Sequence, residues 1–299
     1  MVSTGKVAVT PAATGGGEGR QEESERALAA RLLAEAIAAA HERSANVRTG
    51  PGDDPFGHAL IAWLRAHVPF DHCVAFGYRG TARPPLLFET FNRQESHVYV
   101  TLYQVGPYLL DPFYHAAIER IEGFRRMREL APDRFYASEY YRSYYSQTVL
   151  AEEVGFFVPL ANGASVVVSL MRKAASGVFG AAQVRLLREL APVVLSLCRL
   201  RWGAELIGEE AGDRSGRGEG RAPRELDRGK IWQDLSLTER EGEVVDLILQ
   251  GHSADSIARL LSISAGTAKV HRRNIYRKLN INSQAGLFAH FVAIMRRKP

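Results

Sequence analysis

The stretch LTEREGEVVDLILQGHSADSIARLLSISAGTAKVHRRNIYRKL (residues 237–279) decides the fold of the C-terminal part of this chain. Thr238 and Glu241 form a capping box at its start, because each side chain can accept a hydrogen bond from the backbone N–H of the other. The apolar residues that follow at helical spacing are Val244, Val245 and Ile248. Gly251 then ends this first predicted helix, since glycine readily adopts the left-handed conformation that closes helices.

Two further helices are predicted after this glycine. Ser253 can cap the second helix, and Ser264 can cap a third helix over residues 264–279. The apolar residues of the second helix are Ile257, Leu260 and Leu261. Two short helices and a tight turn that leads to a basic helix predict a helix-turn-helix, whose last helix enters the major groove of DNA.

The third helix separates into two faces when its residues are placed about 100° apart. The buried stripe consists of Ala268, Ile275 and Leu279. The outward face and its flanks consist of Lys269, Val270, Arg273, Asn274 and Arg277. Arg and Lys suit guanine, Asn suits adenine, and Val can contact a thymine methyl group. We therefore predict that this face binds base edges of double-stranded DNA, against the alternative of a solvated helix face.

The charge distribution supports a polyanionic partner. The formal net charge of the 299 residues is only +5, but residues 256–299 contain no Asp or Glu. The nine basic residues of that segment are Arg259, Lys269, Arg272, Arg273, Arg277, Lys278, Arg296, Arg297 and Lys298. Such a one-sided segment forms a positive surface that attracts nucleic acid. A solvated basic tail would have the same charge, so the prediction of DNA binding rests on the helix-turn-helix motif.

The quoted stretch resembles the LuxR/GerE-type DNA-binding domain. The residues that carry the resemblance are 237–241, 243–245, 251, 257–258, 261–264, 267–271, 274–275 and 278–279. The resemblance implies four helices that bind DNA as a homodimer, and it assigns base contacts to Lys269, Val270 and Arg273. The resemblance also gives four candidates for contacts with the DNA backbone or for orienting the helix, namely Thr267, His271, Arg272 and Lys278.

Two departures from the family pattern lie outside the outward face. Ala268 replaces the usual Val, and Ser256 replaces the usual Glu of the second helix. His271 lies at the edge of the buried stripe, so it can serve the domain core as well as DNA. Apolar residues beyond the third helix also follow helical spacing, and we expect them to cover the core or to form a dimer contact. They are Leu287, Phe288, Phe291, Val292 and Ile294.

Composition divides the rest of the chain. We predict a disordered tail over 1–22, a helix and loop over 23–55, an α/β domain over 56–206, a flexible linker over 207–230 and the helical domain over 231–299. The linker prediction rests on its many glycines and its lack of apolar residues. No apolar run reaches the ~18–20 residues that span a bilayer, and no signal peptide is evident. We therefore expect a cytoplasmic protein with two buried thiols, Cys73 and Cys198.

The α/β (α+β) domain is expected to be a sensor-like sandwich with an antiparallel sheet, joined to an all-α four-helix domain. Apolar patterning predicts helices over 57–67 and 183–201 and strands over 72–78 and 86–91. Two more strands, 155–160 and 165–171, flank Asn162-Gly163, which favours a tight hairpin. The pattern lacks the acidic pair of a receiver domain and the phosphate-binding loop of an ATPase.

The remaining possibility for this domain is a ligand sensor of the GAF/PAS or autoinducer-binding kind. The segment from Tyr103 to Asp111-Pro112 loosely resembles the lactone-binding stretch of autoinducer receptors. The candidate ligand-binding residues are Tyr103, Tyr108, Asp111, Phe113, Tyr136 and Tyr140. Asp111 could accept a hydrogen bond from a ligand amide, or it could simply cap a helix. Helical spacing places Tyr136, Tyr140, Tyr141 and Tyr144 on neighbouring positions of one predicted helix, where they could line a pocket or pack as core.

These features predict a sequence-specific DNA-binding transcription regulator that a small ligand or partner modulates. The alternative is a constitutive DNA-binding regulator whose first domain serves only dimerisation or protein interaction. We expect no enzymatic activity, cofactor or metal site, because the histidines are scattered and no nucleophile motif is present. The expected partners are double-stranded DNA, a second copy of the chain, a small molecule and RNA polymerase at the bacterial nucleoid, but no membrane.

Overall fold

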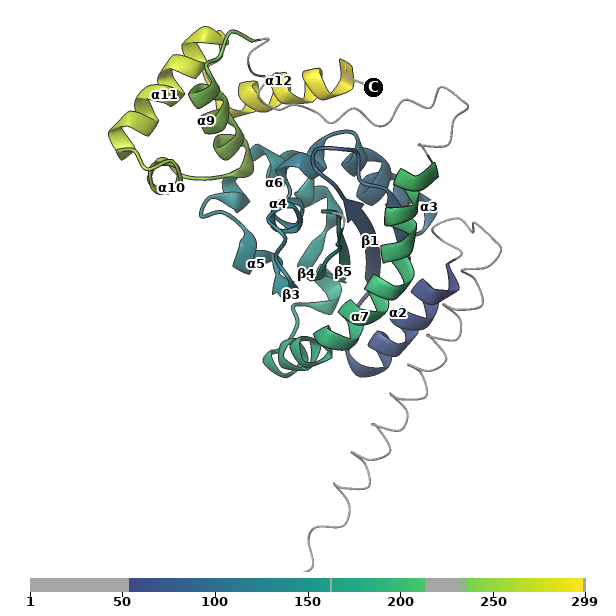
Figure 1. The fold of residues 1–299 in the computed structure, drawn as a ribbon. Helices are drawn as coiled ribbons and strands as arrows, with labels where there is room; N and C mark the ends of the chain where they lie inside the picture. The colour runs from purple at the N-terminus through teal and green to yellow at the C-terminus, as the bar shows by residue number, and fades with distance from the viewer. Residues whose placement is uncertain (1–53, 162, 213–231, 233–234, 298–299) are drawn as a thin grey trace, which may run out of the picture.

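The computed structural model describes residues 54–161, 163–212, 232 and 235–297. The predicted tail over 1–22 and the predicted helix within 23–55 lie outside the described residues. Figure 1 shows an α/β domain that is connected to a group of helices near the C-terminus. Among these helices, α11 (Ala265–Lys278) lies far from the sheet. None of the described helices is long and apolar enough to cross a membrane.

A five-stranded antiparallel sheet forms the centre of the N-terminal domain, in the order β2-β1-β5-β4-β3. Its strands are β1 (His72–Tyr78), β2 (Leu86–Glu89), β3 (Gly123–Arg126), β4 (Leu150–Pro159) and β5 (Ser165–Lys173). The predicted hairpin is confirmed: β4 and β5 pair antiparallel, and Gly163 in their turn has a φ of 82°. That positive φ is why glycine suits this position.

Helices cover both faces of the sheet (Figure 1). Side chains alternate along each strand, so Cys73 and Ala75 face α2 (Pro55–His67) and α7 (Ala181–Gly212), whereas Val74 and Phe76 face the other layer. That other layer contains short helices: α3 (Arg93–Ser96), η2 (His97–Leu102), η3 (Pro107–Leu110), α4 (Pro112–Ile118), α5 (Met127–Leu130), η4 (Phe135–Ala137), α6 (Glu139–Ser143) and η5 (Tyr145–Thr148). One further short helix, η6 (Ala174–Ser176), follows β5. Both cysteines are buried and free, as predicted.

Helix α7 corrects the predicted start of the linker. We expected the helix to end at residue 201 and the linker to begin at 207, but the helix continues to Gly212. Trp202 and Leu206 account for its continuation as far as residue 206, because both are buried in the core between the sheet and α7. Glycine content therefore misled the prediction at 207–212. The rest of the predicted linker, residues 213–230, lies outside the described residues. Trp232, in the predicted helical domain, is helical and buried.

The C-terminal body contains the four predicted helices, α9 (Glu239–Gln250), α10 (Ala254–Leu260), α11 and α12 (Gln284–Arg297). The capping box at Thr238 and Glu241 is present, and Gly251 closes α9 with a φ of 101°. Ser253 and Ser264 accept hydrogen bonds from the backbone at the starts of α10 and α11. Each of these caps satisfies a backbone N–H that the helix itself leaves unpaired.

Candidate nucleic-acid interface and buried cavity

Helix α11 has one buried and one exposed face. Ala268, Ile275 and Leu279 are buried against the neighbouring helices, as the helical spacing predicted. The residues that the structure leaves exposed on this helix include Lys269, Val270, Arg272, Arg273 and Arg277. We use the name recognition face for Lys269, Val270 and Arg273. Val270 is 44% exposed, so its methyl groups are accessible to a contact that forms on binding.

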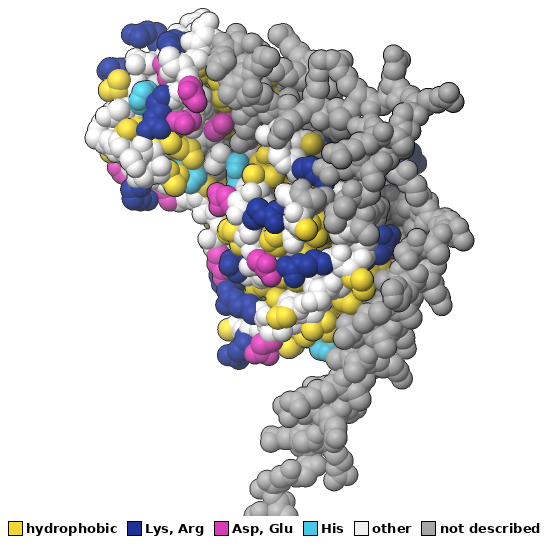
Figure 2. All heavy atoms as spheres, in the orientation of Figure 1, with side chains coloured by type: hydrophobic (Ala, Val, Ile, Leu, Met, Phe, Trp, Pro, Cys, Tyr) yellow, Lys and Arg dark blue, Asp and Glu magenta, His cyan; other side chains and the backbone are white. Residues whose placement is uncertain are grey.

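Neighbouring side chains orient part of this surface. The Arg272 guanidinium lies 5.4 Å from the centre of the Tyr276 ring, a distance typical of a cation–π contact. Arg277 donates a 3.3 Å hydrogen bond to Asn274. Figure 2 shows Lys and Arg side chains gathered over the outer end of the C-terminal helices. The surface remote from the sheet is therefore positively charged.

Three of the predicted DNA-contacting residues also have roles inside the domain. The Lys278 ammonium donates to the Glu241 carboxylate at 2.6 Å and so joins the end of α11 to the start of α9. The Thr267 hydroxyl pairs with that of Ser264 at 2.8 Å, and His271 is half-buried. The contacts of Thr267 and Lys278 position α11, which is one of the two roles expected for these two residues, and His271 lies at the edge of the domain core.

The unusual Ser256 has a structural account. Its side chain is buried, and its hydroxyl lies 2.9 Å from His252 Nδ1, within hydrogen-bonding distance. A bond across one turn thus occupies the place where the family pattern given by the resemblance has a Glu. Arg240 braces the same region by donating hydrogen bonds to the Leu261 carbonyl and to Glu243. Both departures from the family pattern thus leave the recognition face unchanged.

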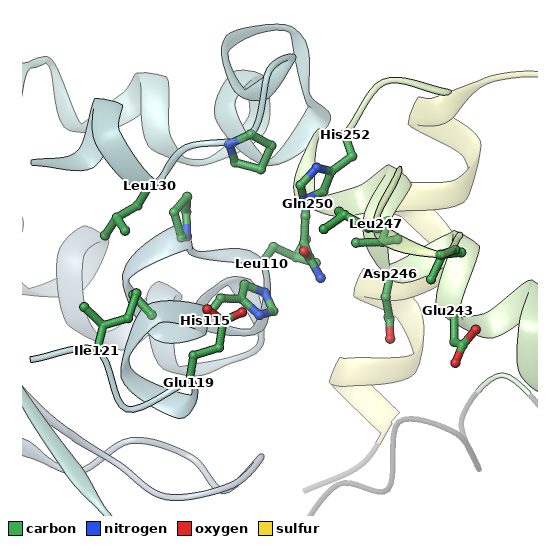
Figure 3. Close-up of a pocket in the computed structure, with 15 residues that line it drawn as sticks. Leu110, His115, Glu119, Ile121, Leu130, Glu243, Asp246, Leu247, Gln250 and His252 are labelled. Carbon is green, nitrogen blue, oxygen red and sulfur yellow. The ribbon is translucent and has the colours of Figure 1, made fainter. Parts of the chain in front are cut away.

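The two domains contact one another around the end of α9. Arg134 donates its backbone N–H to the Gly251 carbonyl at 2.9 Å, and the Ser253 N–H donates to Asp133 at 3.0 Å. A pocket of about 410 Å³ opens beside these contacts (Figure 3). Side chains from both domains line it, among them Leu110, His115, Glu119, Glu243, Leu247 and His252. The interface therefore combines specific hydrogen bonds with unfilled space.

A second, smaller cavity of about 30 Å³ is buried within the N-terminal domain. It lies between the sheet and the short helices, and three predicted ligand-binding residues line it: Tyr103, Asp111 and Tyr140. The Asp111 carboxylate accepts hydrogen bonds from the Phe113 backbone N–H at 2.8 Å and from the Tyr103 hydroxyl at 2.7 Å. The helix-cap interpretation of Asp111 is therefore confirmed, since it caps α4. Asp111 also lines the cavity, and its binding to a ligand stays a prediction.

The other three candidates do not line this cavity. Tyr136 is 60% exposed, because it lies in the short helix η4 and not on a continuous helix with Tyr140 as predicted. The Tyr108 hydroxyl donates to the Thr81 carbonyl. Phe113 packs on the sheet where Gly155 leaves room for its ring. Spacing on an assumed helix could not reveal the break between η4 and α6 that separates Tyr136 from the cavity. Ligand binding by Tyr108 and Phe113 stays a prediction.

Most of the cavity wall was not predicted from the sequence. The polar residues without a prediction are Tyr78, Tyr99, Tyr145, Thr148, Glu153 and Ser169. Glu153 is the most informative, because it is a buried carboxyl group on a strand that is apolar apart from Glu153 and its neighbour Glu152. Its neighbour Glu152 faces the opposite side and forms an ion pair with Arg126. A charged residue within an apolar strand was the available signal for Glu153.

Burial raises the pKa values of both carboxyl groups that line the cavity. Desolvation raises the pKa of Glu153 to about 8, and the nearby negative charge of Asp111 adds to the rise. Desolvation also raises the pKa of Asp111 to about 6, although its hydrogen bonds from Phe113 and Tyr103 oppose the shift. Such perturbed groups in a cavity are typical of functional sites.

The raised pKa of Glu153 predicts that the N-terminal domain loses stability as pH rises. Its contribution is fully present below the ordinary pKa of 4.5 and is lost as pH rises through about 8. Within that window, the free energy of unfolding should fall by roughly 1 kcal/mol per pH unit. Thermal denaturation of Glu153→Gln from pH 5 to 9 should give a flatter profile than the native chain. The exposed Glu189→Gln is the control, and parallel profiles for all three proteins would refute this assignment.

Comparison with known proteins places these features in a class and a family. An exposed basic helix on a helix-turn-helix, joined to an α/β domain with a polar cavity, defines a two-domain DNA-binding regulator. Residues 235–291 match the family described as bacterial regulatory proteins, luxR family. An HTH-type transcriptional regulator in the exeN 3′ region of Aeromonas salmonicida is 30% identical over 185 residues, which cover 61% of this chain and 93% of that protein. The chain belongs to the LuxR family of transcriptional regulators.

Other similarities cover less of the chain. The nitrate/nitrite response regulator protein NarP of Escherichia coli K12 is 52% identical over 48 residues, which are 16% of this chain and 22% of NarP. Among solved structures, the LBD domain of VqsR from Pseudomonas aeruginosa is 26% identical, with a TM-score of 0.47. That similarity covers 57% of this chain and 94% of the VqsR domain.

Proposed function

We propose that this regulator binds a specific DNA sequence as a homodimer, with α11 in the major groove, and that a small molecule in the N-terminal domain modulates the binding. The single observation that carries the DNA-binding proposal is the exposed recognition face of Lys269, Val270 and Arg273 on a helix whose opposite face is buried. Major-groove recognition requires such a face, because base edges are contacted by side chains that point away from the domain core.

The homodimer proposal rests on α12. Its buried residues Leu287, Phe291 and Met295 recur every four positions and pack inside the protein. Phe288 and Val292 are only partly buried and lie beside that stripe. We propose that this second stripe contributes to the contact between two copies. A dimer also doubles the positive surface, which favours binding to a two-fold symmetric site.

The ligand proposal rests on the buried cavity. A purely structural core would be expected to be filled by apolar side chains, whereas this one has two carboxyl groups and several hydroxyl groups on its wall. The competing candidate is a constitutive regulator without a ligand. The direct hydrogen bonds between the two domains are also consistent with this candidate. We further propose a location at the bacterial nucleoid in the cytoplasm and contact with RNA polymerase, because both accompany transcription regulation at promoters.

Selection from a randomised duplex library tests the DNA-binding proposal. The full-length chain should enrich a motif with two-fold symmetry at about 0.15 M salt. Its affinity for that duplex should fall linearly with salt on a log–log plot, since each neutralised phosphate releases counterions. Enrichment of no motif, with equal affinity for all duplexes, would reject sequence-specific binding and leave only electrostatic attraction.

A further inference from the structure

The charge of the small cavity in the N-terminal domain is one-sided. Asp111 and Glu153 both line it, and both are buried. None of the described residues on its wall is Lys, Arg or His. Buried carboxylates are normally paired with a cation or neutralised by protonation, because an isolated charge in a low-dielectric interior is costly. The cavity wall itself thus supplies no positive partner for either group.

The hydrogen bonds that reach the two carboxyl groups come from neutral donors. Tyr78 and Tyr103 hydroxyls lie 2.7 Å apart, and Tyr103 in turn donates to Asp111 at 2.7 Å. The Tyr145 hydroxyl donates to Glu153 at 3.2 Å, and Ser169 also hydrogen-bonds with Glu153. These donors orient the carboxyl oxygens at the cavity wall without balancing a negative charge.

One hydroxyl on the wall has no partner within the part of the chain that the structure describes. The Tyr140 side chain is 1% exposed and lines the cavity, yet its hydroxyl forms no hydrogen bond there. Buried hydroxyl groups are normally satisfied, so this one is available to an occupant of the cavity. This oxygen and the carboxyl oxygens could together accept hydrogen bonds from the N–H groups of a ligand.

Aromatic rings complete the wall. The tyrosines that line the cavity are Tyr78, Tyr99, Tyr103, Tyr140, Tyr144 and Tyr145. The faces of such rings attract cations, and grouped rings form the cages that hold ammonium groups. They do not provide the six or more oxygen ligands that Ca²⁺ prefers. Within the described residues, no group of three or more His, Cys, Asp and Glu side chains could hold a metal ion.

Size restricts the occupant. The cavity volume of about 30 Å³ corresponds to roughly two water molecules, at ~10–15 Å³ for each. A group of two or three heavy atoms fits, whereas a long acyl chain does not. Taking the cavity as the ligand site of the proposed function, we propose that it binds a compact organic cation, the ammonium head of a small amine. The cation is held by Asp111, Glu153 and the surrounding tyrosines.

Proton release is a consequence of this recognition. The pKa of Glu153 is raised to about 8, so this carboxyl group is mostly protonated at neutral pH and ionises when an ammonium group binds. The titratable groups that line the same cavity are Asp111 and the six tyrosines. The tyrosines stay neutral, because burial raises the pKa values of Tyr78, Tyr103 and Tyr140 further. Affinity for the cation therefore increases as pH rises toward about 8.

Titration calorimetry of the full-length chain with methylammonium and ethylammonium tests the proposal. Methanol and formate serve as the neutral and anionic probes of matched size. We expect heat of binding from the cations only, with an affinity that increases from pH 6 to 8. Because binding releases protons to the buffer, the observed heat should depend on the ionisation enthalpy of the buffer. Glu153→Gln should weaken methylammonium binding about tenfold or more, since hydrogen bonds to charged groups are strong.

Two further variants separate recognition from folding. Tyr140→Phe removes only the unpaired hydroxyl, so the thermal midpoint should stay unchanged while the affinity for methylammonium falls about fivefold. Glu189→Gln removes an exposed carboxylate from α7 and should change neither quantity. Equal binding of methanol and methylammonium, no binding of any cation up to the highest concentration, or native affinity in Glu153→Gln would overturn the proposal.

A second measurement separates the failure of this proposal from the failure of the proposed function. The affinity of the chain for the selected duplex is measured with and without methylammonium. Cation binding that leaves DNA affinity unchanged would support the ligand class and refute modulation by this site. A neutral acyl compound that changes DNA affinity, with no cation bound, would support modulation and refute the ligand class.

Discussion

Arg273→Ala should weaken binding to the selected duplex by about 1–3 kcal/mol, which is roughly 5- to 150-fold, and should relax the base preference at one position of each half-site. Arg273 is exposed on the recognition face, where its guanidinium can donate two hydrogen bonds to guanine O6 and N7. Competition binding against duplexes with single base changes measures both effects. A uniform loss of affinity for all duplexes would instead assign Arg273 to the phosphate backbone.

Two controls make the interpretation of Arg273 specific. Arg185→Ala removes the same charge from an exposed position on α7 of the N-terminal domain, and it should leave base preference unchanged. Arg273→Lys keeps the charge but loses the planar pair of donors, so it should keep the salt dependence and lose discrimination at that base. Equal behaviour of Arg273→Ala and Arg185→Ala would contradict a base contact.

Ile275→Ala should destabilise the helix-turn-helix by about 2–5 kcal/mol, the usual cost of truncating a buried Ile. Its side chain is 0% exposed and lies in the core that α9, α10 and α11 share. Amide hydrogen exchange should increase throughout these three helices and leave the sheet of the N-terminal domain unaffected. Ile275→Ala should also abolish specific DNA binding, because the position of the recognition face depends on the packing of α11.

The matched control for Ile275 is Val270→Ala on the opposite face of the same helix. Val270 is largely exposed, so its truncation should change stability by no more than about 0.5 kcal/mol. It should nevertheless weaken binding to duplexes that place a thymine methyl group beneath it. If Val270→Ala destabilised α11 as much as Ile275→Ala did, the assignment of the two faces would be incorrect.

The C-terminal domain could be predicted from sequence because its signals are local. The capping box at Thr238, the left-handed Gly251 and the serine caps each act within one helical turn, and the structure confirms them. The faces of α11 follow from helical geometry alone. What could not be predicted is the partner through which Lys278 orients the helix, because Glu241 lies 37 residues away and is brought close only by the packing of α9 on α11.

The cavity was predicted only in part, because it depends on contacts between distant segments. Asp111 and Tyr103 were found through a local resemblance, whereas Glu153 reaches the cavity from β4 by the alternation of that strand. Tyr136 was misplaced because the aromatic segment forms two short helices and not one continuous helix. The end of α7 was misplaced because Leu206 packs on the sheet at Gly77, a contact that composition does not reveal.

Dimethyl sulfate footprinting of the selected duplex tests the central claim most directly, because it methylates guanine at N7 in the major groove and adenine at N3 in the minor groove. If the recognition face of α11 contacts base edges, the native chain should protect guanine N7 atoms in each half-site. Arg273→Ala should restore methylation at one of them. Protection confined to adenine N3, or a footprint unchanged by Arg273→Ala, would contradict major-groove recognition by this helix.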